Sequence, residues 1–235
     1  MAFAGLGALP PDLWPAVAVT LKLASCTTLI LLAIAMPLAH WLNHSRNALR
    51  PLAEVLVSLP VVLPPTVIGF YLLVLMSPQQ ALGSLWQSLI GSPLPFSFAG
   101  LVVGSVLYSL PFAVQPIQTA FRAVDPALLE SGVALGAPGW RILRAIIIPS
   151  SLHGIATGAT LSFAHTVGEF GVVLMLGGNI PGRTRVASIA LYDQVQQLNY
   201  GAANAFALVL VLISFVLLGL IAAIRRNHVA PLPRI

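Results

Sequence analysis

Residues 202–224 read AANAFALVLVLISFVLLGLIAAI and contain no Asp, Glu, Lys or Arg. An apolar run of this length exceeds the roughly 20 residues that a helix needs to cross a hydrocarbon core about 30 Å thick. A strand of a membrane barrel would need only about 10 residues and would alternate polar with apolar side chains. The run therefore predicts a transmembrane α-helix, in which every backbone polar group is paired within the segment.

Four further apolar runs lie upstream of this one, and the composition of the whole chain agrees with them. They cover residues 16–39, 55–76, 98–120 and 152–176. Hydrophobic residues make up 58% of the 235 residues and charged residues only 7%, whereas a soluble domain averages about 25% charged residues. We therefore expect an all-α, polytopic membrane bundle of five transmembrane helices, and we exclude a soluble enzyme.

The sequence offers little for metal or cofactor chemistry. Cys26 is the single cysteine, so no internal disulfide can form, and no Cys/His spacing indicates a metal site. The formal net charge of +5 is scattered over short segments and forms no basic stripe, which argues against a nucleic-acid partner. No phosphate-binding loop of the Gly-x4-Gly-Lys-Ser/Thr type occurs. We expect no cofactor and no catalytic residue in this chain.

The arginines predict the topology, because Lys and Arg concentrate in the cytoplasmic connections of membrane proteins. Eight arginines fall in three alternating segments: the connection after the first run, the connection after the third run, and the tail. Only Arg183 and Arg185 disagree, and they could attract an anion, contact a partner protein or be a solvated pair. The expected division is an external N-terminal segment 1–15, a transmembrane domain 16–224 and a cytoplasmic tail 225–235.

Prolines interrupt the second apolar run at residues 60, 64 and 65. Each proline removes a backbone donor and clashes with the preceding turn, so this helix must bend or break near mid-membrane. Irregular backbone at that depth is tolerated where protein or a water-filled cavity solvates it, and broken helices recur in transporters. The pattern indicates either a translocation path beside Pro64, Pro65 and Thr66 or a kinked helix that only packs.

Two charged side chains lie inside the apolar runs. Lys22 is two turns inside the first run and can extend its ammonium group to the external interface. Glu169 is costly at its depth; it could shape the path, or it could be a structural carboxylate bonded to a neighbouring helix. Ser109 and Thr166 are further candidates for the path, because a moving cargo needs weak polar contacts. The spacing Gly154-x3-Gly158 predicts a close-packing helix face.

Residues 125–149 connect the third and fourth runs and carry the signals of two short helices. Asp125 followed by Pro126 is typical of a helix N-terminus. Gly136 suits a helix C-terminus, and Pro138 can open a second helix. A helical hairpin with apolar side chains at its tip indicates a docking surface for a soluble partner. The alternative is an amphipathic pair that lies on the lipid headgroups.

The hairpin also resembles a known signature. Glu130-Ser-Gly-x3-Gly136, followed after nine residues by Ile146-x-Ile148-Pro149, resembles the EAA loop of bacterial ABC-importer permeases. That pattern has alanines at the positions of Ser131 and Gly132. In such permeases the loop is a coupling helix that sits in a groove of the ATP-hydrolysing subunit. The resemblance implies that the ATPase-docking residues are Glu130, Ser131, Gly132, Leu135, Gly136 and Ala137.

Residues 59–69, 161–171 and 178–185 resemble the molybdate permease subunits of these importers, and the sulfate and thiosulfate permeases are close relatives. The resemblance implies a type I ABC importer permease fold in the bacterial inner membrane and import of molybdate or tungstate. It implies as partners a second copy of the chain, two ATPase subunits and a periplasmic oxyanion-binding protein. A sulfate importer and an ion-coupled secondary transporter are the alternatives, although the latter would need internal inverted repeats and a coupling-ion site.

Overall fold

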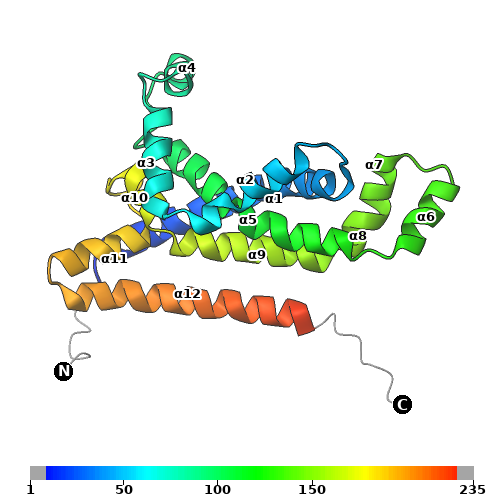
Figure 1. Cartoon of the computed structure of the whole chain (residues 1–235). Coiled ribbons are helices and arrows are strands. Elements are labelled where there is room, and N and C mark those ends of the chain that lie inside the picture. The colour runs from blue at the N-terminus through cyan, green and yellow to red at the C-terminus, as the bar shows by residue number, and fades with distance from the viewer. Residues whose placement is uncertain (1–8, 227–235) are drawn as a thin grey trace.

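Four long helices form the body of the molecule. In the computed structural model, which describes residues 9–226, they are α1 (Leu13–His44), α5 (Phe98–Arg122), α9 (Leu152–Gly168) and α12 (Tyr200–Arg226). The helices pack side by side, and α9 runs antiparallel to the other three (Figure 1). All regular structure in the described range is helical, as the sequence predicts.

Three of these helices, α1, α5 and α12, are each long and apolar enough to cross a membrane. Two bent helix pairs raise the number of possible spans to five, if each pair counts as one span. Residues 1–8 and 227–235 lie outside the described range, and so do parts of the N-terminal segment 1–15 and of the tail 225–235 that the sequence predicts.

The second apolar run is broken where its prolines predict a break. Helix α2 (Arg50–Val62) is followed by Leu63, and α3 (Pro65–Met76) starts two residues after Leu63 at an angle of 115° to α2. Leu63 is extended, with φ −74° and ψ 138°, because the following proline disfavours a helical conformation. Helix α3 leads into α4 (Ala81–Ile90), and the two helices form an arm that projects from the body (Figure 1).

The fourth apolar run is also broken, although it contains no proline. Helix α9 ends at Gly168, and α10 (Gly171–Gly177) begins after the extended residue Glu169. Two further helices occupy connections that the sequence analysis left without structure, namely α4 and α11 (Ala187–Gln196). In contrast, Pro111 and Pro116 do not interrupt α5.

The segment between α5 and α9 is a helical hairpin, as the sequence predicts. Its first helix is α6 (Pro126–Ala134), and its return helix consists of α7 (Gly139–Ile142), the π-helical segment η1 (Leu143–Ile147) and α8 (Ile148–Ser150). The return helix then bends by 73° into α9.

Glycines let α9 approach α5 closely, which confirms the predicted packing face. A Cβ atom on Gly154 would lie 2.2 Å from Ala120 Cβ, and one on Gly158 would lie 2.9 Å from the Ala113 carbonyl oxygen. Both distances are shorter than atoms can tolerate, so the two backbones touch where only glycine fits. The closely packed α5–α9 pair therefore connects the hairpin at one end of the bundle to the region of the two helix breaks, α2–α3 and α9–α10.

Candidate functional site

The hairpin presents an apolar tip at one end of the bundle. Leu135 is 87% exposed and Trp140 is 62% exposed, and Leu128 and Val133 are exposed beside them. Helix α6 starts at Asp125, whose carboxylate accepts a hydrogen bond of 2.9 Å from the Ala127 backbone N–H. Large apolar side chains at the tip of an ordered hairpin are typical of a surface that a partner covers.

Glycine is required at the turn of the hairpin. Gly136 has φ +71°, in the left-handed region that side-chain-bearing residues rarely adopt. The Ala137 N–H donates to the Gly132 carbonyl oxygen at 3.0 Å, and this hydrogen bond closes the C-terminus of α6. Figure 1 shows the turn at the extreme end of the molecule.

The predicted docking residues differ in burial. Glu130, Ser131, Leu135 and Gly136 are exposed on the hairpin, and Ala137 is half-buried. Gly132 is instead buried, and a Cβ atom there would lie 3.0 Å from Ile146 Cδ1. Gly132 therefore allows the two arms of the hairpin to pack closely, and a partner could not reach it without opening them.

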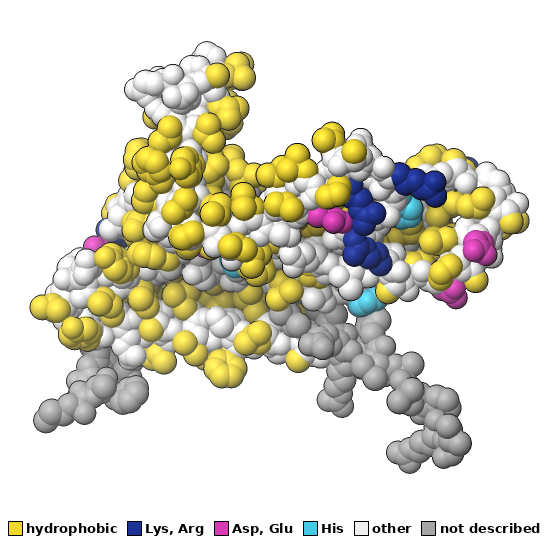
Figure 2. Space-filling view, in the orientation of Figure 1, with side chains coloured by type: hydrophobic (Ala, Val, Ile, Leu, Met, Phe, Trp, Pro, Cys, Tyr) yellow, Lys and Arg dark blue, Asp and Glu magenta, His cyan; other side chains and the backbone are white. Residues whose placement is uncertain are grey.

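A polar network fixes the elements around the hairpin end. Glu54 of α2 pairs with Arg50 at 3.2 Å and with Arg122 of α5 at 3.5 Å. Arg122 Nε also donates to Asn43 Oδ1 of α1 at 2.7 Å. Figure 2 shows Lys and Arg side chains gathered toward this end of the molecule.

The two helix breaks meet at one junction. A Cβ atom on Gly171, the first residue of α10, would lie 2.7 Å from Pro65 Cβ and 3.4 Å from the Thr66 backbone nitrogen. The starts of α3 and α10 are therefore in contact, although more than 100 residues separate them in the sequence. Pro64 and Thr66 are exposed at this junction, and Pro65 is half-buried.

Glu169 satisfies the backbone at the second break. One carboxylate oxygen accepts a hydrogen bond of 2.7 Å from the Val172 N–H in the first turn of α10. The Glu169 carbonyl oxygen, which α9 leaves unpaired, accepts from Ser188 Oγ at 2.6 Å. Glu169 is 6% exposed, and a negative charge at a helix N-terminus is favourable. The geometry supports the structural alternative for this residue.

Ser109 and Thr166 lie in the contact between α5 and α9. Their hydroxyl oxygens are 3.1 Å apart, and Ser109 Oγ is 2.9 Å from His165 Nδ1. Ser109 is fully buried and Thr166 is 2% exposed. Of the three hydroxyl residues that the sequence suggests for a path, only Thr66 is exposed, and it lies at the junction of the breaks.

Replacing Glu169 tests whether its role is the helix cap. Glutamine keeps an oxygen that can accept the Val172 N–H, so we expect E169Q to unfold close to the wild-type temperature. Leucine has no acceptor, so E169L should lose about 2 kcal/mol or more, because a buried N–H is left unpaired. Thermal unfolding in detergent measures both variants. Equal destabilisation of the two would contradict the cap.

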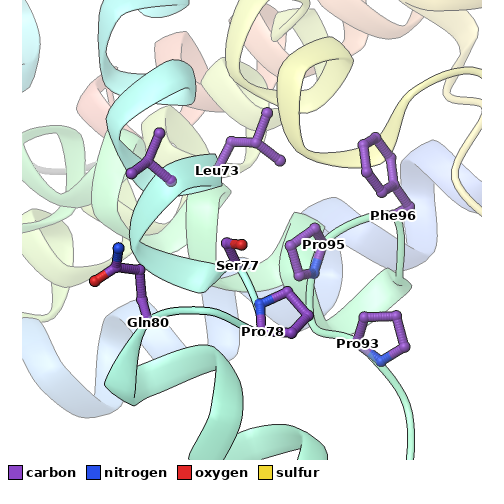
Figure 3. A pocket seen from close by; sticks show the side chains of 8 residues that line it. Leu73, Ser77, Pro78, Gln80, Pro93, Pro95 and Phe96 are labelled. Carbon is purple, nitrogen blue, oxygen red and sulfur yellow. The ribbon is translucent and has the colours of Figure 1, made fainter.

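The end of the bundle opposite the hairpin contains an apolar pocket and an ion-pair cluster. The pocket has a volume of about 420 Å³ and lies between the end of α3 and the segment before α5; Figure 3 shows Pro78, Pro93, Pro95 and Phe96 around it. Such a lining does not suit an oxyanion. At the same end of the bundle, Arg185 forms an ion pair with Asp12 at 3.1 Å.

Arg185 is not the solvated residue that the sequence suggested as one alternative. Besides Asp12 it binds Asp193 at 3.5 Å and donates to Asn179 Oδ1 at 2.6 Å. Its side chain is 17% exposed. The contact with Asp12 spans 173 residues of sequence, so no local pattern could have revealed it.

Two broken helices that meet within a bundle of apolar helices, together with an ordered hairpin at one end, are typical of the membrane-embedded subunit of a transporter. The profile of the family described as "Binding-protein-dependent transport system inner membrane component" matches residues 29–229. The chain belongs to this family.

Curated relatives agree with this assignment, and a solved structure has a similar fold. The chain is 48% identical over 211 residues to the molybdenum transport system permease protein ModB of Azotobacter vinelandii, covering 90% of this chain and 93% of the relative. It is 35% identical over 183 residues to ModB of Escherichia coli K12, covering 78% and 80%. Sulfate transport system permease proteins are also among its relatives. The fold is similar to that of a bacterial ABC transporter involved in alginate import, with a TM-score of 0.75 at 20% identity over 93% of this chain and 81% of the other.

Proposed function

We propose that this chain is the membrane subunit of an ATP-driven importer of molybdate, and that it works as a homodimer with two ATPase subunits and a periplasmic binding protein. The observation that carries the proposal is the hairpin with its exposed Leu135 and Trp140, at the position of the signature of ABC-importer permeases. Molybdate is the proposed cargo because the ModB relatives resemble the chain over most of its length.

In this proposal the hairpin end faces the cytoplasm and docks on the ATPase. ATP binding closes the ATPases and draws the two hairpins together, and hydrolysis resets them. The movement reaches the junction of the breaks because the hairpin continues through η1 and α8 into α9, and α9 leads to Glu169 and α10. The bond cleavage of ATP hydrolysis occurs in the partner subunit, so this chain contributes no catalytic residue.

The arm supports a second copy of the chain as the dimer partner. Helices α3 and α4 project from the body (Figure 1), and their exposed large apolar side chains are Val67, Phe70, Tyr71, Val74, Leu75, Leu82, Leu85, Leu89 and Ile90. A projecting apolar arm gains burial when it packs on another subunit. The path then runs between the two copies and passes the exposed Thr66 of each, whose hydroxyl offers a weak contact to an oxyanion.

Uptake by proteoliposomes tests the proposed function. We expect labelled molybdate to enter vesicles that contain this chain and its ATPase only when the binding protein is outside and ATP is inside. Unlabelled tungstate and sulfate serve as competitors, and stronger inhibition by sulfate would favour the sulfate alternative. Uptake driven by a proton gradient without ATP would contradict the proposal.

A further inference from the structure

Two cationic side chains face one pocket at the end of the bundle opposite the hairpin. The pocket has a volume of about 320 Å³, and Lys22, Phe98 and Arg183 are among its lining residues. Lys22 Nζ lies 4.7 Å from the centre of the Phe98 ring, a cation–π distance. This contact holds the ammonium group at the pocket.

Among the described residues, no carboxylate lines this pocket. Asp12 and Asp193 are both paired with Arg185. Arg185 is the third cationic residue at this end of the bundle. Lys22 and Arg183 therefore have no acidic partner within residues 9–226. Two uncompensated cations around one pocket favour an anion between them.

The depth of Lys22 fits the boundary of the hydrocarbon core. Trp41 lies near the other end of α1 and is 38% exposed, and exposed tryptophans favour membrane interfaces. The 19 residues from Lys22 to Trp41 span about 28 Å of helix, close to the core thickness of about 30 Å. Lys22 is thus at headgroup level when Trp41 is at the opposite interface.

An apolar helix face leads from the pocket into the membrane. Leu29 lies two turns below Lys22 on the same face of α1 and is 69% exposed. Leu21 and Ile30 are exposed beside this face. A ligand with an anionic headgroup and an acyl chain would contact both the cationic pocket and the apolar helix face. A free inorganic anion would contact the pocket alone.

We propose that the pocket binds the phosphate group of an anionic phospholipid, with Lys22 and Arg183 as its cationic ligands and an acyl chain along the α1 face at Leu29. Arg183 can offer two parallel N–H donors to phosphate oxygens, and Lys22 contributes a point charge. None of the lining residues of this pocket is among the candidates for the cargo path, so the proposal stands whether or not the cargo is molybdate.

The sequence makes this site accessible to a direct assay, because Lys22 is the single lysine of the chain. The full chain is placed in nanodiscs of phosphatidylcholine, with or without phosphatidylglycerol. The rate at which an amine-reactive reagent modifies Lys22 is then followed by mass spectrometry. We expect phosphatidylglycerol to slow this modification at least about fivefold, the effect of roughly 1 kcal/mol of binding. In R183Q the slowing should fall below about twofold, since one of the two charges is lost.

A matched control separates specific binding from the general surface charge of the lipid. The variant R46K introduces a second amine outside the pocket, and its modification should slow much less than that of Lys22 in the same discs. Equal slowing of both amines, or undiminished protection in R183Q, would overturn the proposal. Protection of Lys22 by sulfate or molybdate in phosphatidylcholine alone would also overturn it, because the pocket would then be a site for soluble anions.

Discussion

Replacing Leu135 by aspartate should abolish association with the ATPase and reduce molybdate uptake to background. Leu135 is 87% exposed at the tip of the hairpin, so the substitution leaves the fold of this chain intact. In the proposed complex the same side chain is covered by the ATPase. An unpaired carboxylate at a desolvated position costs at least about 3 kcal/mol, roughly a hundredfold in the dissociation constant. Co-purification and ATP-dependent uptake measure the loss.

Leu49 provides the matched control for this variant. It is 60% exposed in the connection before α2, outside the hairpin, and its N–H is held by Asn47 Oδ1 at 2.9 Å. The change L49D introduces the same charge by the same substitution, so we expect normal association and uptake. Normal coupling in L135D, or equal loss in L49D, would contradict the assignment of the hairpin as the docking element.

The second large effect is expected at the contact between α5 and α9. In G154A the new methyl group would lie 2.2 Å from Ala120 Cβ and 3.0 Å from the Pro116 carbonyl oxygen. The helices must separate to admit it, which costs about 1–3 kcal/mol by overpacking. We expect a lower unfolding temperature in detergent and weaker uptake, because this pair connects the hairpin to the breaks.

Gly168 is the control for this packing effect. It lies on the same helix as Gly154, and a Cβ atom added to it meets nothing within 4 Å. Since alanine favours a helix over glycine by up to about 1 kcal/mol, G168A should be as stable as the wild type or slightly more so. If G154A and G168A unfold at the same temperature, the close contact of α5 and α9 is not a determinant of stability.

The sequence predicts the elements whose physical cause is local. Apolar length identifies the long helices, the prolines at 60, 64 and 65 predict the break between α2 and α3, and Asp125 and Gly136 mark the ends of α6. Each of these signals depends on a few neighbouring residues. The signature of the hairpin is local for the same reason.

Features that depend on distant parts of the chain could not be predicted in this way. The break after α9 is stabilised by Ser188, 19 residues away, and the ion pair of Arg185 with Asp12 spans 173 residues. Glu169 is an indication of the second break, because a carboxylate within an apolar run needs donors and a new helix N-terminus supplies them. In the sequence, Ser109, Thr166 and Thr66 are equivalent candidates, because each is a hydroxyl residue within an apolar run. Only the burial of Ser109 and Thr166 in the structure distinguishes them from Thr66.

The central claim is that the hairpin faces the cytoplasm and contacts the ATPase, and cysteine labelling tests it most directly. Cys26 is the single cysteine, so L135C in a C26S background gives one reporter thiol at the hairpin tip. L82C on α4, which is 62% exposed in the wild type, gives a reporter at the other end. We predict that an impermeant maleimide labels L135C only in inside-out vesicles, that the ATPase protects it, and that L82C shows the opposite sidedness. Labelling of L135C from the periplasmic side, or no protection by bound ATPase, would contradict the account.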